Sequence, residues 1–211
     1  MTIITAVQKD NEIAIACDTQ TTSGMSLKCT ADYKVNHIKL IPYGHSIFGL
    51  SGSVAISQMF EDLLMQGDPV PLASRSEIFR WLLSNQDTLK TEYFLKPDVP
   101  NDKQQPAESQ GLSALMAYPF GIFSINRYRE VVEYSKFWAI GSGGAFALGA
   151  LDILYDQKLT AAEIAKAAAL TATKFNPGCA PPIYVETIQR IVTKETTKTT
   201  KRKRTTKKKK S

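Results

Sequence analysis

The sequence has few of the residues from which metal sites and disulfide frameworks are built. Among 211 residues there are three cysteines and two histidines, and neither a C-x-x-C pair nor an H-E-x-x-H motif occurs. Widely spaced cysteines in odd number argue against a disulfide framework and fit a reducing compartment. We therefore expect no metal and no cofactor, and imidazole chemistry is restricted to His37 and His45.

Long apolar runs and complete nucleotide-binding motifs are missing as well. No stretch approaches the roughly 18 apolar residues of a membrane span, and the N-terminus lacks the layout of a signal peptide. The sequence predicts a cytoplasmic protein without a membrane span. In Gly141-Ser142-Gly143, the third glycine of a G-x-G-x-x-G motif is replaced by Phe146, and Gly49–Ser53 lacks the lysine of a P-loop. We interpret both segments as tight turns.

Positive charge is concentrated at the C-terminus. The formal net charge is +6, but ten Lys or Arg residues and one Glu fall between Lys194 and Ser211. The remainder is therefore mildly acidic. Because the tail also lacks apolar residues, nothing offsets the entropy of ordering it. We expect one domain over residues 1–193 and a disordered basic tail over 194–211, which is either solvated or in contact with nucleic acid or another acidic surface.

The hydrophobic pattern predicts an α+β fold. Strand-like runs come first, followed by two amphipathic helices, further strands, two more helices and a last strand. This clustering favours mostly antiparallel sheets over βαβ alternation. The predicted strands are 2–7, 12–18, 33–40, 46–50, 112–118, 121–126, 130–134, 137–140 and 183–192, and the predicted helices contain 56–64, 75–83, 145–155 and 161–175.

The first two strands bring candidate chemistry together. A hairpin turn near Asp10 places Asp18 opposite Thr2. Removal of Met1 would give Thr2 both a hydroxyl and a free α-amine, whose ordinary pKa of about 8 lets it act as a base near neutral pH. Lys34 lies on the next predicted strand, with Asp32 on the same face. Taken singly, each of these residues has an ordinary structural explanation.

Together these residues resemble the proteasome β-subunit and HslV-type threonine peptidases, a family of N-terminal nucleophile hydrolases. The resemblance covers nearly the whole chain except the tail. It rests on the order and spacing of four motifs: Thr2-Ile3-Ile4, Ala16-Cys17-Asp18-Thr19-Gln20 with Lys34 after it, Phe48-Gly49-Leu50-Ser51-Gly52, and Ile140-Gly141-Ser142-Gly143-Gly144. The best fit within the family is a divergent bacterial proteasome homologue of the beta-proteobacterial group.

The resemblance implies a role for each matching residue. Thr2 would be the nucleophile, Asp18 and Lys34 a charge pair beside it, Gly52 the donor to the oxyanion, and Ser142 a partner of the amine. Thr21, Asp32 and Leu50 would shape the main specificity pocket, where Asp32 would favour basic substrate side chains. The implied fold is a four-layer α-β-β-α sandwich.

The implied function is that of a threonine endopeptidase that degrades peptides or unfolded proteins inside a hexameric or heptameric homo-oligomeric ring, served by an ATPase unfoldase. Some features depart from the family pattern. Ile3 and Cys17 replace the usual Thr and Gly, and 174–181 lacks the late Asp and Ser of proteasome subunits. Two alternatives stay open: a catalytically silent ring subunit, which a retained Met1 would favour, and a nucleic-acid-binding protein acting through the basic tail.

Overall fold

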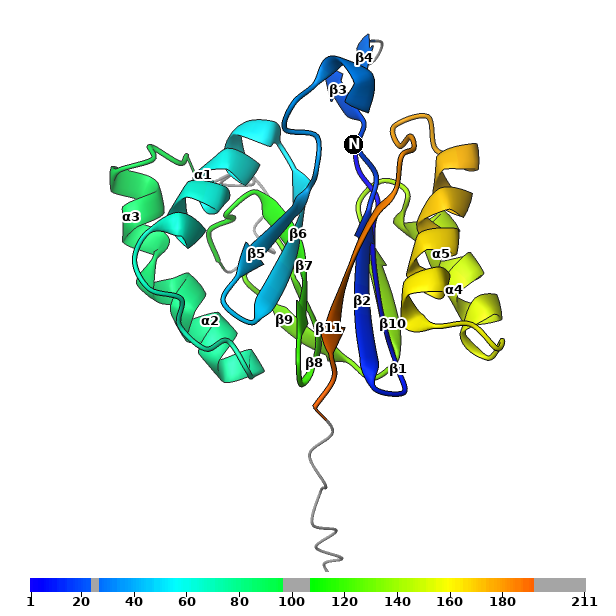
Figure 1. Ribbon diagram of the computed structural model, residues 1–211. Coiled ribbons are helices and arrows are strands. Elements are labelled where there is room, and N and C mark those ends of the chain that lie inside the picture. The colour runs from blue at the N-terminus through cyan, green and yellow to red at the C-terminus, as the bar shows by residue number, and fades with distance from the viewer. Residues whose placement is uncertain (24–26, 97–106, 192–211) are drawn as a thin grey trace, which may run out of the picture.

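Two antiparallel sheets lie face to face at the centre of the molecule (Figure 1). The computed structural model describes residues 1–23, 27–96 and 107–191. One sheet has the strand order β10-β1-β2-β11, the other β5-β6-β7-β8-β9, and β3 and β4 form a separate hairpin. The strands are β1 (Ile4–Lys9), β2 (Glu12–Cys17), β3 (Thr21–Ser23), β4 (Leu27–Cys29), β5 (Leu40–Tyr43), β6 (Ser46–Gly52), β7 (Leu112–Tyr118), β8 (Gly121–Ile125), β9 (Val131–Tyr134), β10 (Phe137–Ile140) and β11 (Tyr184–Gln189).

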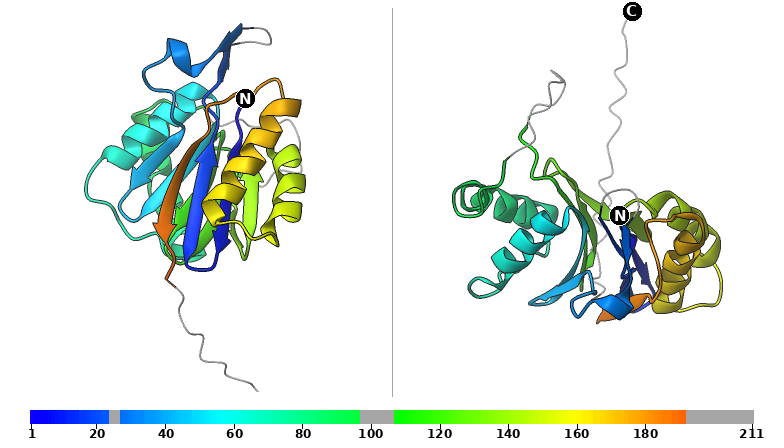
Figure 2. Two further views of the ribbon diagram at one scale, coloured as in Figure 1. Left: turned by 45° about the vertical axis from the view of Figure 1, so that its right-hand side comes forward. Right: turned by 90° about the horizontal axis from the view of Figure 1, so that it is seen from above.

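Helices cover the outer face of each sheet (Figure 2). The helices α1 (Val54–Met65) and α2 (Arg75–Ser84) lie against the five-stranded sheet, with α3 (Gln86–Thr91) packed beside α2. The helices α4 (Gly144–Tyr155) and α5 (Ala161–Phe175) lie against the four-stranded sheet. The first group buries large side chains such as Phe60 and Leu82. The second buries mainly alanines, which let α5 approach the sheet closely. The elements thus stack in the order helix, sheet, sheet, helix.

The hairpin β1–β2 is buried on both faces. Ile3, Val7 and Ala14 contribute to the cluster under α4 and α5, while Ile4 and Ile15 contribute to the cluster between the sheets. Since successive side chains point to opposite faces of a strand, covering both faces requires a continuous apolar run. This is why the hairpin stands out in the sequence.

Most of the predicted elements are confirmed. Every strand pair recorded among the described residues is antiparallel, and the α+β prediction holds. Two of the helices are capped by a hydroxyl: Thr160 forms a capping box with Glu163, and Ser74 accepts a hydrogen bond from the Glu77 backbone. The structure adds α3 and the β3–β4 hairpin, neither of which was predicted. The predicted tail over 194–211 lies outside the described residues.

The strand predicted over 33–40 is wrong. Residues Ala31–Tyr33 form a short 3-10 helix, η1, and regular pairing starts only at Leu40, opposite Gly49 of β6. Val35 is 95% exposed, so the segment has no sheet face to bury. Alternation of polar and apolar residues does not make a strand where no neighbouring strand accepts its backbone hydrogen bonds. The expectation that Asp32 and Lys34 share a strand face falls with it.

Candidate active site

Thr2 and Asp18 lie side by side at one end of the β1–β2 hairpin. The register pairs Ile4 with Cys17, and the Ile3 backbone exchanges hydrogen bonds with Asp18. Its N–H donates to Asp18 Oδ1 at 3.0 Å, and its carbonyl accepts from the Asp18 N–H at 3.2 Å. The predicted placement of Asp18 next to Thr2 is confirmed, with the register shifted by one residue.

The Asp18 carboxylate is completely buried, and both of its oxygens accept hydrogen bonds. Besides Ile3 N–H, Oδ1 accepts from Lys39 Nζ at 2.6 Å, and Oδ2 accepts from the backbone N–H groups of Gln20 and Ala180, both at 3.2 Å. Burying a carboxylate is costly unless donors surround it. These four donors offset that cost and fix the direction in which Asp18 presents its charge.

Lys39, and not Lys34, is the cation between Asp18 and Thr2. Its Nζ lies 2.6 Å from Asp18 Oδ1 and 3.2 Å from Thr2 Oγ1, and its side chain is 15% exposed. The expected pairing of Lys34 with Asp18 is therefore corrected. Lys34 Nζ instead donates to Thr19 O at 2.7 Å and Thr21 Oγ1 at 2.6 Å.

Lys39 and Lys34 differ in how the structure holds their backbones. Lys39 directly precedes β5, and its carbonyl accepts from Leu50 N–H of β6 at 3.2 Å, so the edge of the five-stranded sheet fixes its backbone. Lys34 follows η1, where no strand fixes the backbone. A sequence signal did exist, because Lys39 immediately precedes an apolar strand just as Asp18 immediately follows one.

The turn between β10 and α4 wraps around Thr2. The Thr2 N–H donates to Ser142 Oγ at 3.3 Å, and the Thr2 carbonyl accepts from Gly143 N–H at 3.2 Å. Gly141 has a φ of +93°, and a Cβ at this position would lie 2.2 Å from Thr2 O. Only glycine fits there. The structure therefore brings the predicted Ser142 to the backbone nitrogen of Thr2.

Met1 covers the hydroxyl of Thr2. Thr2 Oγ1 donates to Met1 O at 2.6 Å, and the Met1 terminal ammonium donates to Thr22 Oγ1 at 3.3 Å. The Met1 side chain lies against Gly178, where a Cβ would come within 2.4 Å of it. While Met1 is attached, the Thr2 nitrogen is an amide and has no basic lone pair.

Asn176 is a site residue that sequence reasoning missed. Its Nδ2 donates to Ser142 O at 2.6 Å, and its Oδ1 accepts from Gly178 N–H at 2.8 Å. It thereby ties the end of α5 to the turn that holds Thr2. Cys179 lies beside it, with Sγ 3.9 Å from Ser142 Oγ, and burial raises the pKa of this thiol to about 11. The only signal in the sequence was the position of Asn176 at the end of the α5 pattern.

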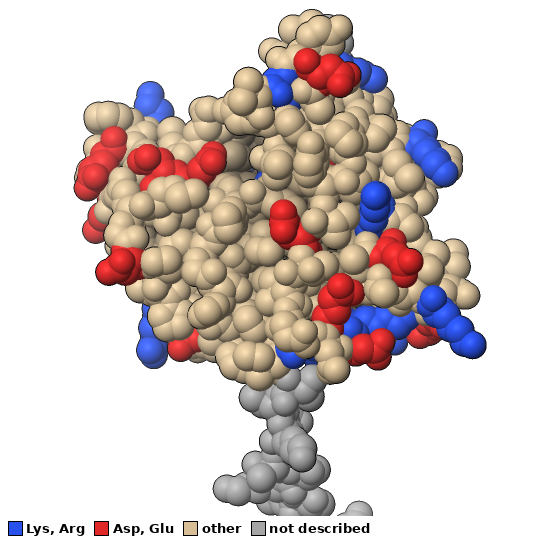
Figure 3. Space-filling model, viewed as in Figure 1, with Lys and Arg blue, Asp and Glu red and all other residues tan. Residues whose placement is uncertain are grey.

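A cavity of about 420 Å³ opens beside Thr2. It is lined by the predicted pocket residues Thr21 and Leu50, by Gly52 and by Lys34. The surface is hollowed here, between α1 and the β3–β4 hairpin (Figure 3). Asp32, which was expected in this pocket, is exposed and does not line it, so the expected preference for basic side chains loses its basis.

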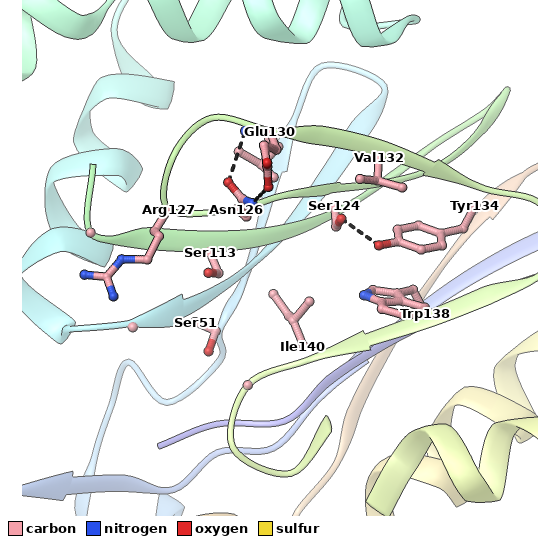
Figure 4. A pocket seen from close by; sticks show the side chains of 14 residues that line it. Ser51, Ser113, Ser124, Asn126, Arg127, Glu130, Val132, Tyr134, Trp138 and Ile140 are labelled. Atoms are coloured by element: carbon pink, nitrogen blue, oxygen red, sulfur yellow. Dashed lines mark hydrogen bonds between the residues drawn. The ribbon is translucent and has the colours of Figure 1, made fainter. Parts of the chain in front are cut away.

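A second cavity, of about 570 Å³, lies between β10 and the five-stranded sheet (Figure 4). It shares Gly52 with the first cavity but is not lined by Thr2 or Lys39. Tyr134 and Trp138 stack along it with ring centroids 4.4 Å apart, and the Ser124 and Tyr134 hydroxyls lie 2.9 Å apart. No candidate nucleophile with an adjacent base lines this cavity, so the chemistry is assigned to the first one.

The part of the chain that the structure describes contains no cluster of three or more His, Cys, Asp or Glu side chains that could hold a metal ion. Within those same ranges, no helix is long and apolar enough to cross a membrane. The side chains gathered at Thr2 are instead a hydroxyl, an ammonium group and a carboxylate, a set suited to acyl transfer by a nucleophile.

Solved structures share this architecture, although no protein-family model and no curated protein matches the sequence. BPH of Thiobacillus denitrificans in complex with epoxomicin superposes with a TM-score of 0.82 at 33% identity, over 90% of this chain and 100% of that one. A second structure of Thiobacillus denitrificans BPH superposes with a TM-score of 0.81 at 33% identity, over 89% of this chain and 97% of that one.

HslV from Trypanosoma brucei superposes with a TM-score of 0.61 at 20% identity, over 89% of this chain and 99% of that one, and shows the shared fold. The similarity to BPH is higher and extends over 90% of this chain. The motifs at Thr2, Asp18, Gly52 and Ser142 gather at one end of the two sheets, as the resemblance implied. The chain belongs to the proteasome β-subunit and HslV-type family.

Proposed function

We propose that this protein is a threonine endopeptidase in which Thr2, exposed by removal of Met1, is the nucleophile. One observation carries the proposal: Lys39 Nζ lies 3.2 Å from Thr2 Oγ1 and 2.6 Å from the buried Asp18 carboxylate. A nucleophilic hydroxyl, a cation beside it and a carboxylate that orients the cation are the parts that N-terminal nucleophile chemistry needs. The stacked α-β-β-α order and the family membership support the same assignment.

In the proposed reaction, the α-amine of Thr2 accepts the proton from Oγ as Oγ attacks the substrate carbonyl carbon. The backbone N–H of Gly52 stabilises the resulting oxyanion. The tetrahedral intermediate collapses with cleavage of the C–N bond, and the α-ammonium gives its proton to the departing amine. Water, deprotonated by the same amine, then hydrolyses the ester that joins the substrate to Thr2.

Lys39 favours this chemistry through its charge. A cation at 3.2 Å stabilises negative charge developing on Thr2 Oγ and disfavours a second positive charge on the neighbouring α-amine. Asp18 holds Lys39 in place through their ion pair. Ser142, held by Asn176, lies at the Thr2 nitrogen and would position the α-amine.

We propose further that the enzyme acts in the cytoplasm inside a hexameric or heptameric ring of identical chains, on peptides or on unfolded proteins delivered by an ATPase unfoldase. Family membership supports enclosure. The physical argument is that a permanently active nucleophile is hazardous on an open monomer. Light scattering should then give a mass many times 23.3 kDa, and a monodisperse monomer would refute the ring while leaving the chemistry testable.

Intact mass combined with labelling by epoxomicin, the compound named with BPH, tests the nucleophile. We expect loss of the Met1 mass and one added inhibitor per chain, and no addition to Thr2→Ala. While Met1 is attached, Thr2 Oγ1 donates to Met1 O and the Thr2 nitrogen is an amide, so a chain that kept Met1 would be a silent ring subunit. A retained Met1 without labelling would favour that silent subunit.

A further inference from the structure

The cavity beside Thr2 contains a cation whose charge no carboxylate neutralises. Three described charged side chains line the cavity: Lys34, Lys39 and Glu61. Lys39 is paired with Asp18, and Glu61 lies exposed on α1. Among the residues that the structure describes, no ion pair within 4.0 Å involves Lys34. Lys34 is therefore the half-buried charge that dominates the cavity.

The Lys34 ammonium group has bonding capacity to spare. An ammonium group has three N–H donors. Two of them reach neutral oxygens, Thr19 O at 2.7 Å and Thr21 Oγ1 at 2.6 Å. One donor remains for a ligand in the cavity. Hydrogen bonds between an ammonium group and a carboxylate are stronger than those to neutral oxygens, so an anionic group would gain most from this donor.

Hydrogen bonds within its own segment, and not a strand, hold the backbone of Lys34. Its N–H donates to Ala31 O at 3.0 Å, and its carbonyl lies 3.1 Å from His37 Nδ1. Because a carbonyl only accepts, Nδ1 carries a proton, and His37 Nε2 then accepts from the Tyr184 hydroxyl at 2.8 Å when the ring is neutral. The ammonium group is thus held in place before a substrate arrives.

The electrostatic surroundings agree with an unneutralised cation. Burial, and next the charge of Lys39, lower the pKa of Lys34 from its ordinary value, and the attraction of Asp18 is the smallest contribution. A carboxylate entering the cavity would offset both effects through its opposite charge. Glu61 opposes such a ligand, but solvent screens an exposed charge far more than a half-buried one.

We propose that Lys34 selects substrates with an acidic side chain on the residue whose carbonyl carbon Thr2 attacks. This inference rests on the peptidase function proposed above. Thr2, Gly52 and Lys34 line the same cavity, so a carbonyl held between Thr2 Oγ and Gly52 N–H leaves the side chain of its own residue in the cavity that Lys34 lines. The preference is opposite to the one expected from Asp32, which does not line the cavity.

The test uses fluorogenic peptides that differ only at that residue, with Glu, Gln or Arg. Glu and Gln have the same shape, so their ratio of kcat/KM isolates the charge. We expect Glu to exceed Gln by about tenfold, since hydrogen bonds to charged groups discriminate by about that factor or more. Lys34→Arg should keep the ratio, Lys34→Met should bring it close to one, and Lys34→Glu should make Arg the preferred residue. Lys28→Met, on β4 and outside the cavity, is the matched control and should keep the wild-type ratio.

Binding separates this inference from the peptidase proposal. Affinities of uncleavable Glu and Gln peptides for the assembled protein are measured by calorimetry, with the same Lys34 and Lys28 variants. A Glu preference that disappears in Lys34→Met without any hydrolysis would support binding of an acidic side chain by Lys34 and would overturn the peptidase, and with it the substrate position assigned to that side chain. Equal affinity and equal turnover of the Glu and Gln peptides, or a wild-type preference for Arg that would point to Glu61, would overturn the inference while leaving the peptidase in place.

Discussion

The two lysines beside Thr2 lie in regions that hold a cation in different ways. Lys39 donates to Asp18, which is completely buried at the end of β2 and has four hydrogen bonds. Lys34 follows η1 in a segment where Tyr33 and Val35 are 83% and 95% exposed, and its ammonium group bonds to neutral oxygens. The charge of Lys39 is therefore neutralised by Asp18, whereas the charge of Lys34 is available to a ligand.

The two ways of holding a lysine suit two different tasks, the chemistry proposed at Thr2 and the selection of a substrate side chain. Proposed chemistry at Thr2 needs groups fixed to within a fraction of an ångström, and paired strands with a buried ion pair provide such precision. Selection of a side chain requires an accessible group, which an irregular segment outside the sheets can present and vary without disturbing the core. Substitutions in the two regions should therefore have effects of different kind and size.

The largest effect is expected at Thr2. Thr2→Ala removes the attacking oxygen, so turnover should fall by a factor on the order of 10⁴ or more while the assembly and the unfolding midpoint stay unchanged. Thr2→Ser keeps the hydroxyl and the amine and should retain part of the activity. Steady-state peptidase assays and urea unfolding measure the two quantities.

Thr5→Ala is the matched control, because Thr5 donates its buried hydroxyl to Ala165 O at 2.9 Å and lies on β1, directly after the segment that contains Thr2. It removes the same atoms and should lower stability by about 1 kcal/mol with little change in turnover. A fully active Thr2→Ala protein would show that the chemistry does not depend on Thr2.

The sequence predicted one of these regions far better than the other. The hairpin that places Asp18 beside Thr2 is local, and burial on both faces gives it a continuous apolar pattern. The path of residues 30–39 is set instead by single side-chain hydrogen bonds with Thr19, Thr21 and Tyr184, of which only Tyr184, 147 residues from His37, is distant along the chain. No periodicity records such contacts, so the wrong lysine was assigned to Asp18.

The second prediction compares the two lysines directly. Lys39→Met leaves the buried Asp18 carboxylate without its cation, which should cost about 3–5 kcal/mol of unfolding free energy and reduce turnover of every peptide by at least about 10²-fold. Lys34→Met removes hydrogen bonds from a half-buried group and should cost only about 1 kcal/mol. Urea unfolding and kcat/KM for the Gln peptide measure both effects.

A double-mutant cycle sharpens the comparison. Adding Asp18→Asn to Lys39→Met removes the unpaired charge and should recover part of the lost stability, although not the activity. Adding Asp18→Asn to Lys34→Met should give an additive loss, because Lys34 does not contact Asp18. If the losses of unfolding free energy were additive in both double mutants, the two lysines would not differ in their coupling to Asp18, and the comparison would fail.

Asn176, at the end of α5, tests whether the region around Thr2, Asp18 and Lys39 includes residues of that helix end. Asn176→Ala removes the donor to Ser142 O, so the turn around Thr2 should lose precision and kcat should fall about tenfold with little change in KM. Labelling of Thr2 by epoxomicin should slow by the same factor. Asn85→Ala is matched, since Asn85 Nδ2 donates to Trp81 O at 2.7 Å away from the site, and it should change stability only. Equal kinetics for the two variants would limit the catalytic region to Thr2, Asp18 and Lys39.

The smallest effect is expected at Tyr184 of β11, which hydrogen-bonds to His37 in the irregular segment that contains Lys34. Tyr184→Phe removes the hydroxyl that reaches His37 Nε2 at 2.8 Å and should cost about 0.5–1.5 kcal/mol of unfolding free energy. The segment that holds Lys34 would loosen, so the Glu-to-Gln ratio should fall by about twofold, whereas turnover of the Gln peptide should stay the same. Tyr134→Phe, which removes the hydroxyl facing Ser124 in the other cavity, should leave the ratio unchanged. If Tyr184→Phe instead lowered turnover of both peptides tenfold, the irregular segment would control the position of Lys39 as well, and selection and chemistry could not be assigned to separate regions.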